Sequence, residues 1–403
     1  MKWQACLILI LIGVLVYLTI APPETDAIPA FARRYKMSCS TCHAPFPRLK
    51  PYGEEFAGNG FYIPEEEKER DYVTAGDPLL WLNKTFPVAV RLEAFGVYND
   101  ASDVEADMQT PWGVKLLSGG PIAKNIGYYF YFYLSERGEV AGVEDAYIHF
   151  NNLFGSELDV MVGQFQASDP LMKRELRLTF EDYEAYKKRI GESRVNLAYE
   201  RGVMLPFSIP KTGTDVVAMI VNGNGIVEAG EDREFDEDKY KNFALRVLQG
   251  IGDALSIGGF AYWGKEEAPE DVVFGEGTNE TVYFGGDAGF SSAQMAFSGQ
   301  YLYRKDQNPF FRENGDFFAS YPMDVQTHAI IAEIILSPDL ERSRHYFTLL
   351  YNWIDSDDDA ADYETGTFNT TYVLARNIRL LAEYTYDFGK EANRGVFGIV
   401  SAF

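Results

Sequence analysis

Three observations predict that this sequence folds as an all-β protein, a transmembrane antiparallel β-barrel of about sixteen strands. From about residue 86 onward, short segments alternate polar and apolar side chains, which is the pattern of strands with one wet and one apolar face. Aromatic residues make up 15% of the chain, and membrane barrels carry aromatic girdles at both interfaces. The connections between the segments also alternate between long and short.

The first 27 residues have the form of an export signal. A basic residue precedes an apolar run from Ala5 to about Ala21, and small residues near Ala27 suit a cleavage site. A retained membrane anchor is the alternative, because the run approaches the roughly 20 residues that a spanning helix needs. Cleavage would leave two of the three cysteines in the mature chain.

Those two cysteines lie in the pentapeptide Cys39-Ser40-Thr41-Cys42-His43. At this spacing two thiols can bond the vinyl groups of a haem while the adjacent imidazole ligates its iron. A thioredoxin-like redox pair would need a surrounding βαβ pattern, and a zinc site would need a second pair of soft ligands. A disulfide or a chance match is the remaining alternative. The motif therefore predicts one covalent haem c, held by Cys39, Cys42 and His43.

Residues 28–63 form the predicted haem segment, and a charged linker, residues 64–85, connects it to the barrel at 86–403. A segment this short buries too little surface to be stable alone. We expect the barrel lumen to cover the haem, with the segment as a plug in the periplasmic mouth.

Sixteen segments of the barrel region fit the strand pattern. The predicted strands cover residues 86–98, 111–118, 126–134, 142–150, 157–166, 194–205, 213–221, 240–249, 255–264, 280–288, 293–303, 326–336, 343–354, 367–374, 378–387 and 395–403.

The connections after odd-numbered strands are mostly long, and those after even-numbered strands are short. Outer-membrane barrels have this asymmetry, with short periplasmic turns and longer outside loops, whereas a soluble β-sandwich, the alternative fold, gives no reason for it. The longest connection, residues 167–193, is helix-prone and resembles the loop that folds into the lumen of sixteen-stranded porins. "VGQF" at 162–165 and "ERGVML" at 200–205 resemble motifs of phosphate-selective porins.

The haem segment itself resembles a second family. Pro29, Phe31-Ala32-Arg33, the haem pentapeptide and "YGEEF" at 52–56 are similar to the amino-terminal segment of fused monohaem cytochrome-porins, which include outer-membrane iron oxidases. The resemblance implies an outer-membrane electron conduit: an extracellular donor, with Fe(II) first among candidates, reduces the haem, and a periplasmic cytochrome or other carrier accepts the electron. The enzyme class would be an Fe(II):cytochrome c oxidoreductase. The alternative is a porin for small solutes with the haem segment as plug or gate.

The net charge of the chain distinguishes between possible classes of partner. The formal net charge is −24, so nucleic acid is excluded as a partner, whereas cations and basic proteins suit such a polyanion. Acidic residues gather in the long connections. Asp355, Asp357, Asp358 and Asp359 offer oxygen ligands suited to a divalent cation; the alternative is that they solvate the surface or bind calcium.

The sixth ligand of the haem iron must come from elsewhere in the chain. His149 shares a strand face with Asp145 and Tyr147, which predicts a lumen position near the short-turn end. His328 and His345 share parity with apolar neighbours and should face lipid. His149 is therefore the predicted distal ligand, and the alternatives are water or the methionines Met161, Met172 and Met204.

Overall fold

The computed structural model describes residues 30–61, 63, 72–73, 76–80, 82–83, 86–230, 233–269, 277–312 and 324–403. The expected signal, residues 1–27, and most of the expected linker lie outside these ranges. Among the described residues, no helix has the length and apolar character needed to cross a bilayer.

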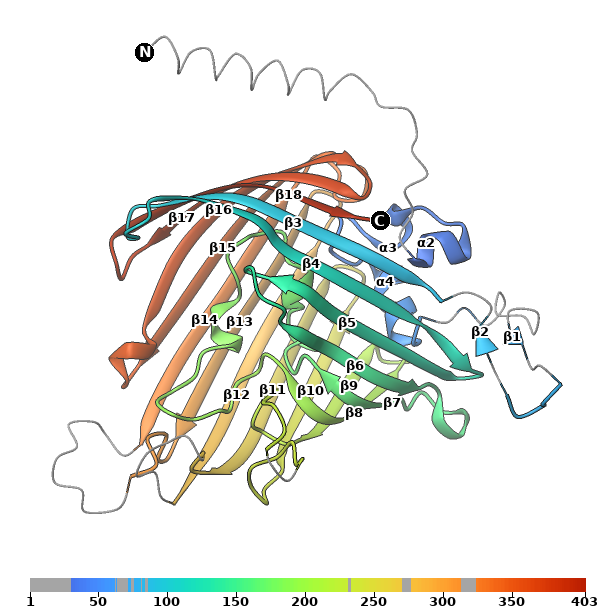
Figure 1. The fold of residues 1–403 in the computed structure, drawn as a ribbon, viewed down its shortest axis with the longest axis horizontal. Coiled ribbons are helices and arrows are strands. Elements are labelled where there is room, and N and C mark those ends of the chain that lie inside the picture. Colours follow the sequence, from blue (N-terminus) through green and yellow to red (C-terminus); the bar gives the residue numbers. More distant parts are fainter. Residues whose placement is uncertain are drawn as a thin grey trace, which may run out of the picture.

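Sixteen antiparallel strands close into one barrel, as the sequence predicts (Figure 1). Each strand pairs with its neighbours in the chain, and the last, β18, pairs with the first, β3. A separate two-stranded ladder joins β1 (Tyr72–Val73) to β2 (Leu82–Asn83). The barrel strands are β3 (Val88–Asn99), β4 (Ala106–Ala123), β5 (Ile126–Glu136), β6 (Gly142–Phe150), β7 (Val160–Phe165), β8 (Glu200–Ile209), β9 (Thr214–Val221), β10 (Asn242–Ile251), β11 (Leu255–Glu267), β12 (Thr278–Ser291), β13 (Met295–Asp306), β14 (Val325–Leu336), β15 (His345–Ser356), β16 (Tyr363–Ala375), β17 (Ile378–Asp387) and β18 (Ala392–Ala402).

Every predicted strand has a counterpart. The start of one of them, β8, differs from the prediction for a physical reason. Residues 194–199 belong to the connection before β8, not to the strand. Val195 and Leu197 alternate with polar residues as they would in a strand, yet both side chains are fully buried inside the barrel. Alternation alone does not distinguish a wall strand from an extended segment that crosses the lumen.

The barrel has its polar side chains inside and its apolar side chains outside. On β16, Thr365, Thr367, Asn369 and Thr371 point inward and are buried, whereas Phe368 between them is 44% exposed on the outer face. Strands of a membrane barrel alternate in this way because one face meets lipid and the other meets the lumen.

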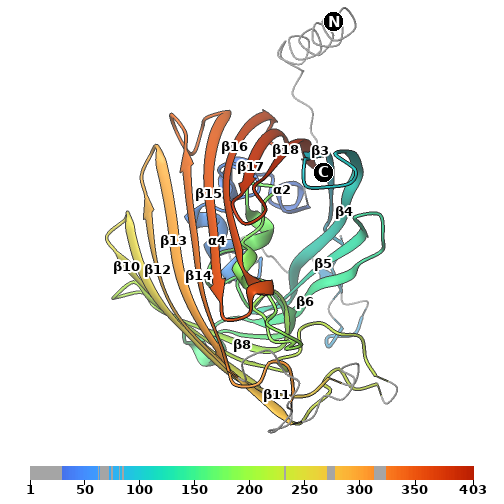
Figure 2. The ribbon, with the colours of Figure 1, turned by 90° about the vertical axis from the view of Figure 1, so that its left-hand side faces the viewer.

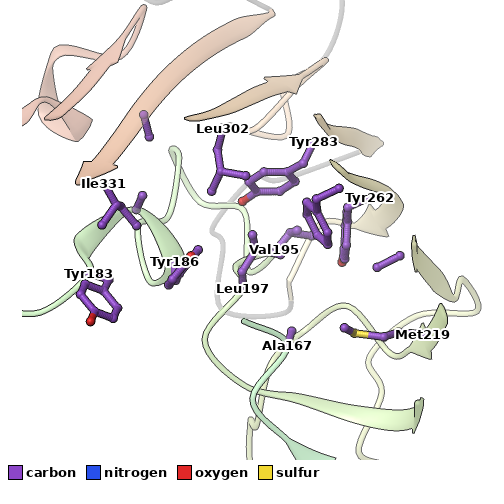
Figure 3. Packing of buried hydrophobic residues seen from close by; sticks show 14 of the residues in the cluster. Ala167, Tyr183, Tyr186, Val195, Leu197, Met219, Tyr262, Tyr283, Leu302 and Ile331 are labelled. Atoms are coloured by element: carbon purple, nitrogen blue, oxygen red, sulfur yellow. The ribbon is translucent and has the colours of Figure 1, made fainter. Parts of the chain in front are cut away.

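The connection between β7 and β8, residues 166–199, folds into the lumen (Figure 3). The side chains of Tyr183, Tyr186, Val195 and Leu197 pack against a wall formed by residues of β9 to β15, including Ile331. The expected lumen position is therefore seen, but the expected helical character is wrong. Only two 3-10 turns form, at Arg174–Leu176 and Glu184–Tyr186, because buried backbone groups of this segment pair with wall side chains instead. We call residues 166–199 the inner loop.

Three short helices precede the barrel: α2 (Ala30–Tyr35), α3 (Cys39–Cys42) and α4 (Pro51–Gly58). They lie at the end of the barrel that carries the short turns, and Figure 2 shows α2 and α4 within the outline of the strands. We call residues 30–61 the plug.

The outward faces generate a prediction about membrane stability. Phe397 lies in the middle of β18 and is 55% exposed. Phe397→Arg is expected to lower the free energy of unfolding in lipid vesicles by about 2–4 kcal/mol, because a cation at the bilayer midplane loses its hydration. Urea titration of vesicle-embedded protein measures the change.

The matched control is Phe388→Arg, at the loop end of β17, where the same substitution costs about 0–1 kcal/mol near the interface. Equal losses at the two positions would show that these strands do not span a bilayer.

Candidate functional site

The two cysteines lie on the single turn of α3, directly before the histidine. The Ser38 side chain caps this turn by accepting from the backbone N–H of Ser40. Cys39 and Cys42 are both half-buried, and no disulfide joins them. One helical turn places the two thiols on neighbouring positions of the same face, so the geometry suits two thioether bonds to one planar group.

His43 is oriented by its own chain. Its Nδ1 lies 2.8 Å from the carbonyl oxygen of Pro47, to which the ring donates when Nδ1 is protonated. That hydrogen bond fixes the tautomer and leaves Nε2 as the ligating nitrogen, the arrangement found around metal-bound histidines. Burial lowers the pKa of His43, although the bond to Pro47 opposes the shift. The imidazole is therefore neutral at physiological pH, as ligation requires.

A glycine permits the next helix to pack closely on α3. A Cβ at Gly53 would lie 2.4 Å from the carbonyl oxygen of Cys42, so any side chain there would displace α4 from α3. The close approach holds the pentapeptide, four residues of which form α3, against α4.

Beside the pentapeptide lies a small hollow that is partly open to solvent. The plug and the barrel wall both line it. Its residues include Cys39, His43 and Phe46 from the plug and Tyr346, Val373 and Arg376 from β15, β16 and the turn after β16.

These residues fit a haem c. Cys39 and the imidazole border one hollow, Cys42 lies one helical turn from Cys39, apolar side chains line part of the hollow, and the histidine already has the hydrogen bond that a ligand needs. Burial raises the pKa of both thiols, which disfavours the thiolate form that a zinc ion binds. Two cysteines and a histidine are the residues that a c-type haem would use. A zinc site would need a second pair of soft ligands, and among the described residues no three or more His, Cys, Asp or Glu side chains are placed to share a metal ion.

Ion pairs hold the plug in the barrel. Arg48 pairs with Glu333 of β14, whose carboxylate is buried and also accepts from the Tyr183 hydroxyl of the inner loop at 3.0 Å. Lys50 pairs with Glu341 in the turn after β14, at 3.1 Å. Glu54 of α4 in turn pairs with Lys173 of the inner loop. The plug is thus bonded to both the wall and the inner loop.

Apolar contacts complete the docking. Phe31, Phe56 and Phe61 pack together, and Phe61 stacks on Tyr129 of β5 with ring centroids 5.1 Å apart. On the same strand, a Cβ at Gly127 would lie 2.6 Å from the carbonyl oxygen of Gly60. The sequence analysis missed this contact. Glycine inside a strand was the available signal, because it marks a close approach of another backbone.

His149 lies in the lumen, as its strand parity predicts, and is almost fully buried. Its Nε2 is 3.2 Å from an Asp159 carboxylate oxygen, and its Nδ1 faces Gly60 at the end of the plug. The neighbouring Asn151 side chain donates to the carbonyl oxygen of Asn59. The structure therefore brings His149 to the plug, but it does not place this residue among those that line the hollow beside His43.

The other candidate iron ligands separate into two groups. Met161, Met172 and Met204 lie inside the barrel, where they pack with the main buried cluster. His328 and His345 point away from the lumen, as expected; His328 meets the Tyr301 hydroxyl at 2.7 Å on the outer face.

The four aspartates at the end of β15 and in the loop before β16 do not converge. Asp355, Asp357 and Asp359 are exposed, whereas the buried Asp358 accepts from the backbone N–H groups of Gly191 and Ala360. Among the described residues, no three or more His, Cys, Asp or Glu side chains are placed to share a metal ion. A divalent cation site at these aspartates stays a prediction.

The paired charges generate a stability prediction. Arg48→Gln is expected to destabilise the docked plug by about 3–5 kcal/mol, because it leaves the carboxylate of Glu333 buried without a cation. Lys50→Gln is the matched control and should cost about 0–1 kcal/mol, because its partner Glu341 is largely exposed. Proteolysis of residues 30–61 in increasing urea measures both.

Adding Glu333→Gln to Arg48→Gln should recover part of the loss. Similar losses for the Arg48 and Lys50 variants would contradict the buried pairing.

The comparisons with known proteins concern the barrel. No family model matches the chain, and no curated protein matches it. Among solved structures, OmpT, an outer membrane protein of Vibrio cholerae, superposes with a TM-score of 0.55 at 12% identity, over 79% of this chain and 99% of that one. An anion-selective porin from Comamonas acidovorans gives 0.56 at 11% identity, over 79% and 99%. The outer membrane channel DcaP of Acinetobacter baumannii gives 0.51 at 14% identity, over 79% and 97%.

Identities this low establish architecture and not activity. The chain has the fold of the sixteen-stranded outer-membrane porins.

Proposed function

We propose that this protein is an outer-membrane electron conduit in which a single haem c, held by Cys39, Cys42 and His43 in the mouth of a porin-type barrel, passes electrons between an extracellular donor and a periplasmic carrier. The observation that carries the proposal is the pentapeptide itself. It is ordered on one helical turn, with His43 already hydrogen-bonded to Pro47 and with Cys39 and His43 bordering the same hollow.

When bound, haem c supplies a one-electron couple. The chain's own residues hold and orient it: the cysteines tether it, His43 ligates it through Nε2, and Phe46 packs beside the imidazole with ring centroids 5.4 Å apart. Arg48 and Lys50 keep this segment in the barrel. His149 remains the proposed distal ligand, with the lumen methionines as its alternatives.

The position of the plug supports a haem on the inner side of the membrane. In outer-membrane barrels the short turns face the periplasm and the longer loops face outward. The plug lies at the short-turn end, where a soluble cytochrome or other carrier can reach it. The exposed Asp355, Asp357 and Asp359 lie in a connection of the opposite end, where negative charge attracts cations. These features support Fe(II) as the donor and an Fe(II):cytochrome c oxidoreductase as the class.

The barrel likeness favours a second function, a porin for small solutes whose plug acts as a gate. The Comamonas protein is named an anion-selective porin and the Acinetobacter protein a channel. Against an open pore here, the inner loop crosses the lumen: its backbone N–H groups at Phe180 and Glu181 donate to Glu383 of β17 at 2.7 and 2.9 Å.

The first experiment tests the conduit directly. Purified protein carrying covalent haem should show a reduced haem spectrum after anaerobic mixing with Fe(II). The variant Cys39→Ser/Cys42→Ser should lose covalent haem and the reaction, while it still folds as a barrel. Stopped-flow absorbance gives the rate.

A holoprotein that Fe(II) does not reduce would refute this donor. If it then conducts ions in planar bilayers, and release of the plug by Arg48→Gln raises that conductance, the porin function is the correct one.

The second experiment tests the acidic loop. Neutralising Asp355, Asp357 and Asp359 to Asn should slow reduction by Fe(II) on the order of tenfold at low ionic strength, because charged surfaces raise the encounter rate of cations. The difference should vanish near 1 M salt, where the screening length is about 3 Å. Asp358 is left intact because it holds the Gly191 and Ala360 backbone.

A control triple at the short-turn end, Glu157→Gln, Asp215→Asn and Asp253→Asn, removes the same charge and should leave the rate unchanged. Equal slowing by both triples would mean that net charge, and not this loop, sets the rate.

A further inference from the structure

Arg379 is a buried cation without a counter-ion. It is the first inward-facing residue of β17 and only 3% exposed. Its Nη1 donates to the carbonyl oxygen of Leu178 at 2.9 Å, and its Nε is buried with no acceptor. Among the described residues, no carboxylate lies within ion-pair distance of this guanidinium. The nearest acidic groups, Glu93 and Glu383, act on it only at longer range.

Those acidic groups already have other partners. Glu93 pairs with Arg91 and Lys115. Glu383 accepts from the two inner-loop amides and from Asn369. Two further arginines, Arg91 and Arg177, also act on Arg379 and disfavour its positive charge. A buried charge of this kind is costly unless an anion compensates it.

Arg379 adjoins the hollow of the candidate haem site. Its direct cross-strand partner is Val373, which lines the hollow. Leu178, whose carbonyl it holds, packs with Val373 and Tyr346, and both of these line the hollow. The ladder has a bulge between Val373 and Ala375, directly before Arg376. Bulges at the rim of a barrel re-aim side chains, and here the next residue, Arg376, borders the hollow with Cys39 and His43.

We propose that Arg379, with Arg376 at the rim, binds the carboxylate of a haem propionate. This inference rests on the proposed haem function and adds the residues of the barrel wall that recognise the cofactor. Guanidinium groups bind carboxylates through paired, charge-assisted hydrogen bonds, and the free Nε of Arg379 supplies one donor of such a fork.

The basic residues of the plug are the competing candidates, and their contacts argue against them. Arg48 and Lys50 are engaged by Glu333 and Glu341. Arg33 donates to the backbone carbonyl of Val88. Arg33, Arg48 and Lys50 thus fasten the plug, whereas Arg379 of the wall has no carboxylate partner among the described residues.

A small permeant anion in the lumen offers Arg379 the same negative charge as a propionate does. Both sources would satisfy Arg379, so the experiment has one arm for each. A propionate partner couples Arg379 to the reduction potential of the haem, whereas a permeant anion couples it to ion selectivity.

The test uses the holoprotein in detergent, titrated spectroelectrochemically with chemical mediators, so it does not depend on Fe(II). Arg379→Gln should lower the midpoint potential, because loss of a cation beside a propionate leaves negative charge that favours the oxidised iron. Covalent attachment through Cys39 and Cys42 should be retained. Arg379→Lys should restore part of the shift, and Arg376→Gln should give a smaller downward shift.

Arg342→Gln is the matched control: an exposed arginine in the turn after β14, at the same end of the barrel. It should leave the midpoint unchanged. If Arg379→Gln does not fold, the test uses Arg376→Gln and Arg379→Lys. Midpoint potentials equal to that of the wild type in both variants would overturn the inference.

A shift no larger than that of Arg342→Gln would overturn it as well. An unchanged midpoint potential together with an altered reversal potential in planar bilayers would also overturn the inference. That result would assign the site to a permeant anion. Failure of Fe(II) to reduce the wild-type holoprotein would refute the donor without touching this result, whereas a wild type without covalent haem would refute both.

Discussion

The closed ring of backbone hydrogen bonds is the constraint on which this molecule depends. Hydrocarbon offers no partner to an unpaired N–H or C=O group, so a strand can cross a bilayer only in a sheet without edges. The pairing of β18 with β3 removes the last edge. Since the outer face must then be apolar, most charged side chains of the strands are confined to the lumen, and the lumen becomes a polar core.

That polar core explains how the inner loop and the plug are held. Each enters a space lined by ionisable side chains, and each satisfies some of them: Glu383 receives two amides of the inner loop, and Glu333 receives Arg48 of the plug and Tyr183 of the loop. Breaking one partner of such a buried pair is costly. The plug, too short to be stable alone, obtains from the barrel the surface and the counter-charges that it lacks.

The same confinement separates the two ends of the molecule chemically. At the short-turn end, Arg376 of the turn before β17 borders the hollow beside His43, and Arg379 of β17 lies opposite Val373 of its lining. At the long-loop end, exposed aspartates stand at the tip of the barrel. A cation would be attracted to one end, and an acidic group of a cofactor to the other.

The sequence by itself determined the number and order of the strands, which face each strand residue takes and where the Cys39–His43 pentapeptide lies. These are local properties: side-chain direction alternates with a period of two, so the inward position of His149 and the outward positions of His328 and His345 followed from parity alone. Only the tertiary structure decided which inward residues meet. Arg48 and Glu333 lie 285 positions apart in the chain, and nothing local links them. Val195 and Leu197 look like a strand until closure of the barrel places them in the lumen. Whether Arg379 has a carboxylate partner likewise depends on which carboxylates pair with other residues. Those pairs form only when all sixteen strands and the inner loop enclose one volume.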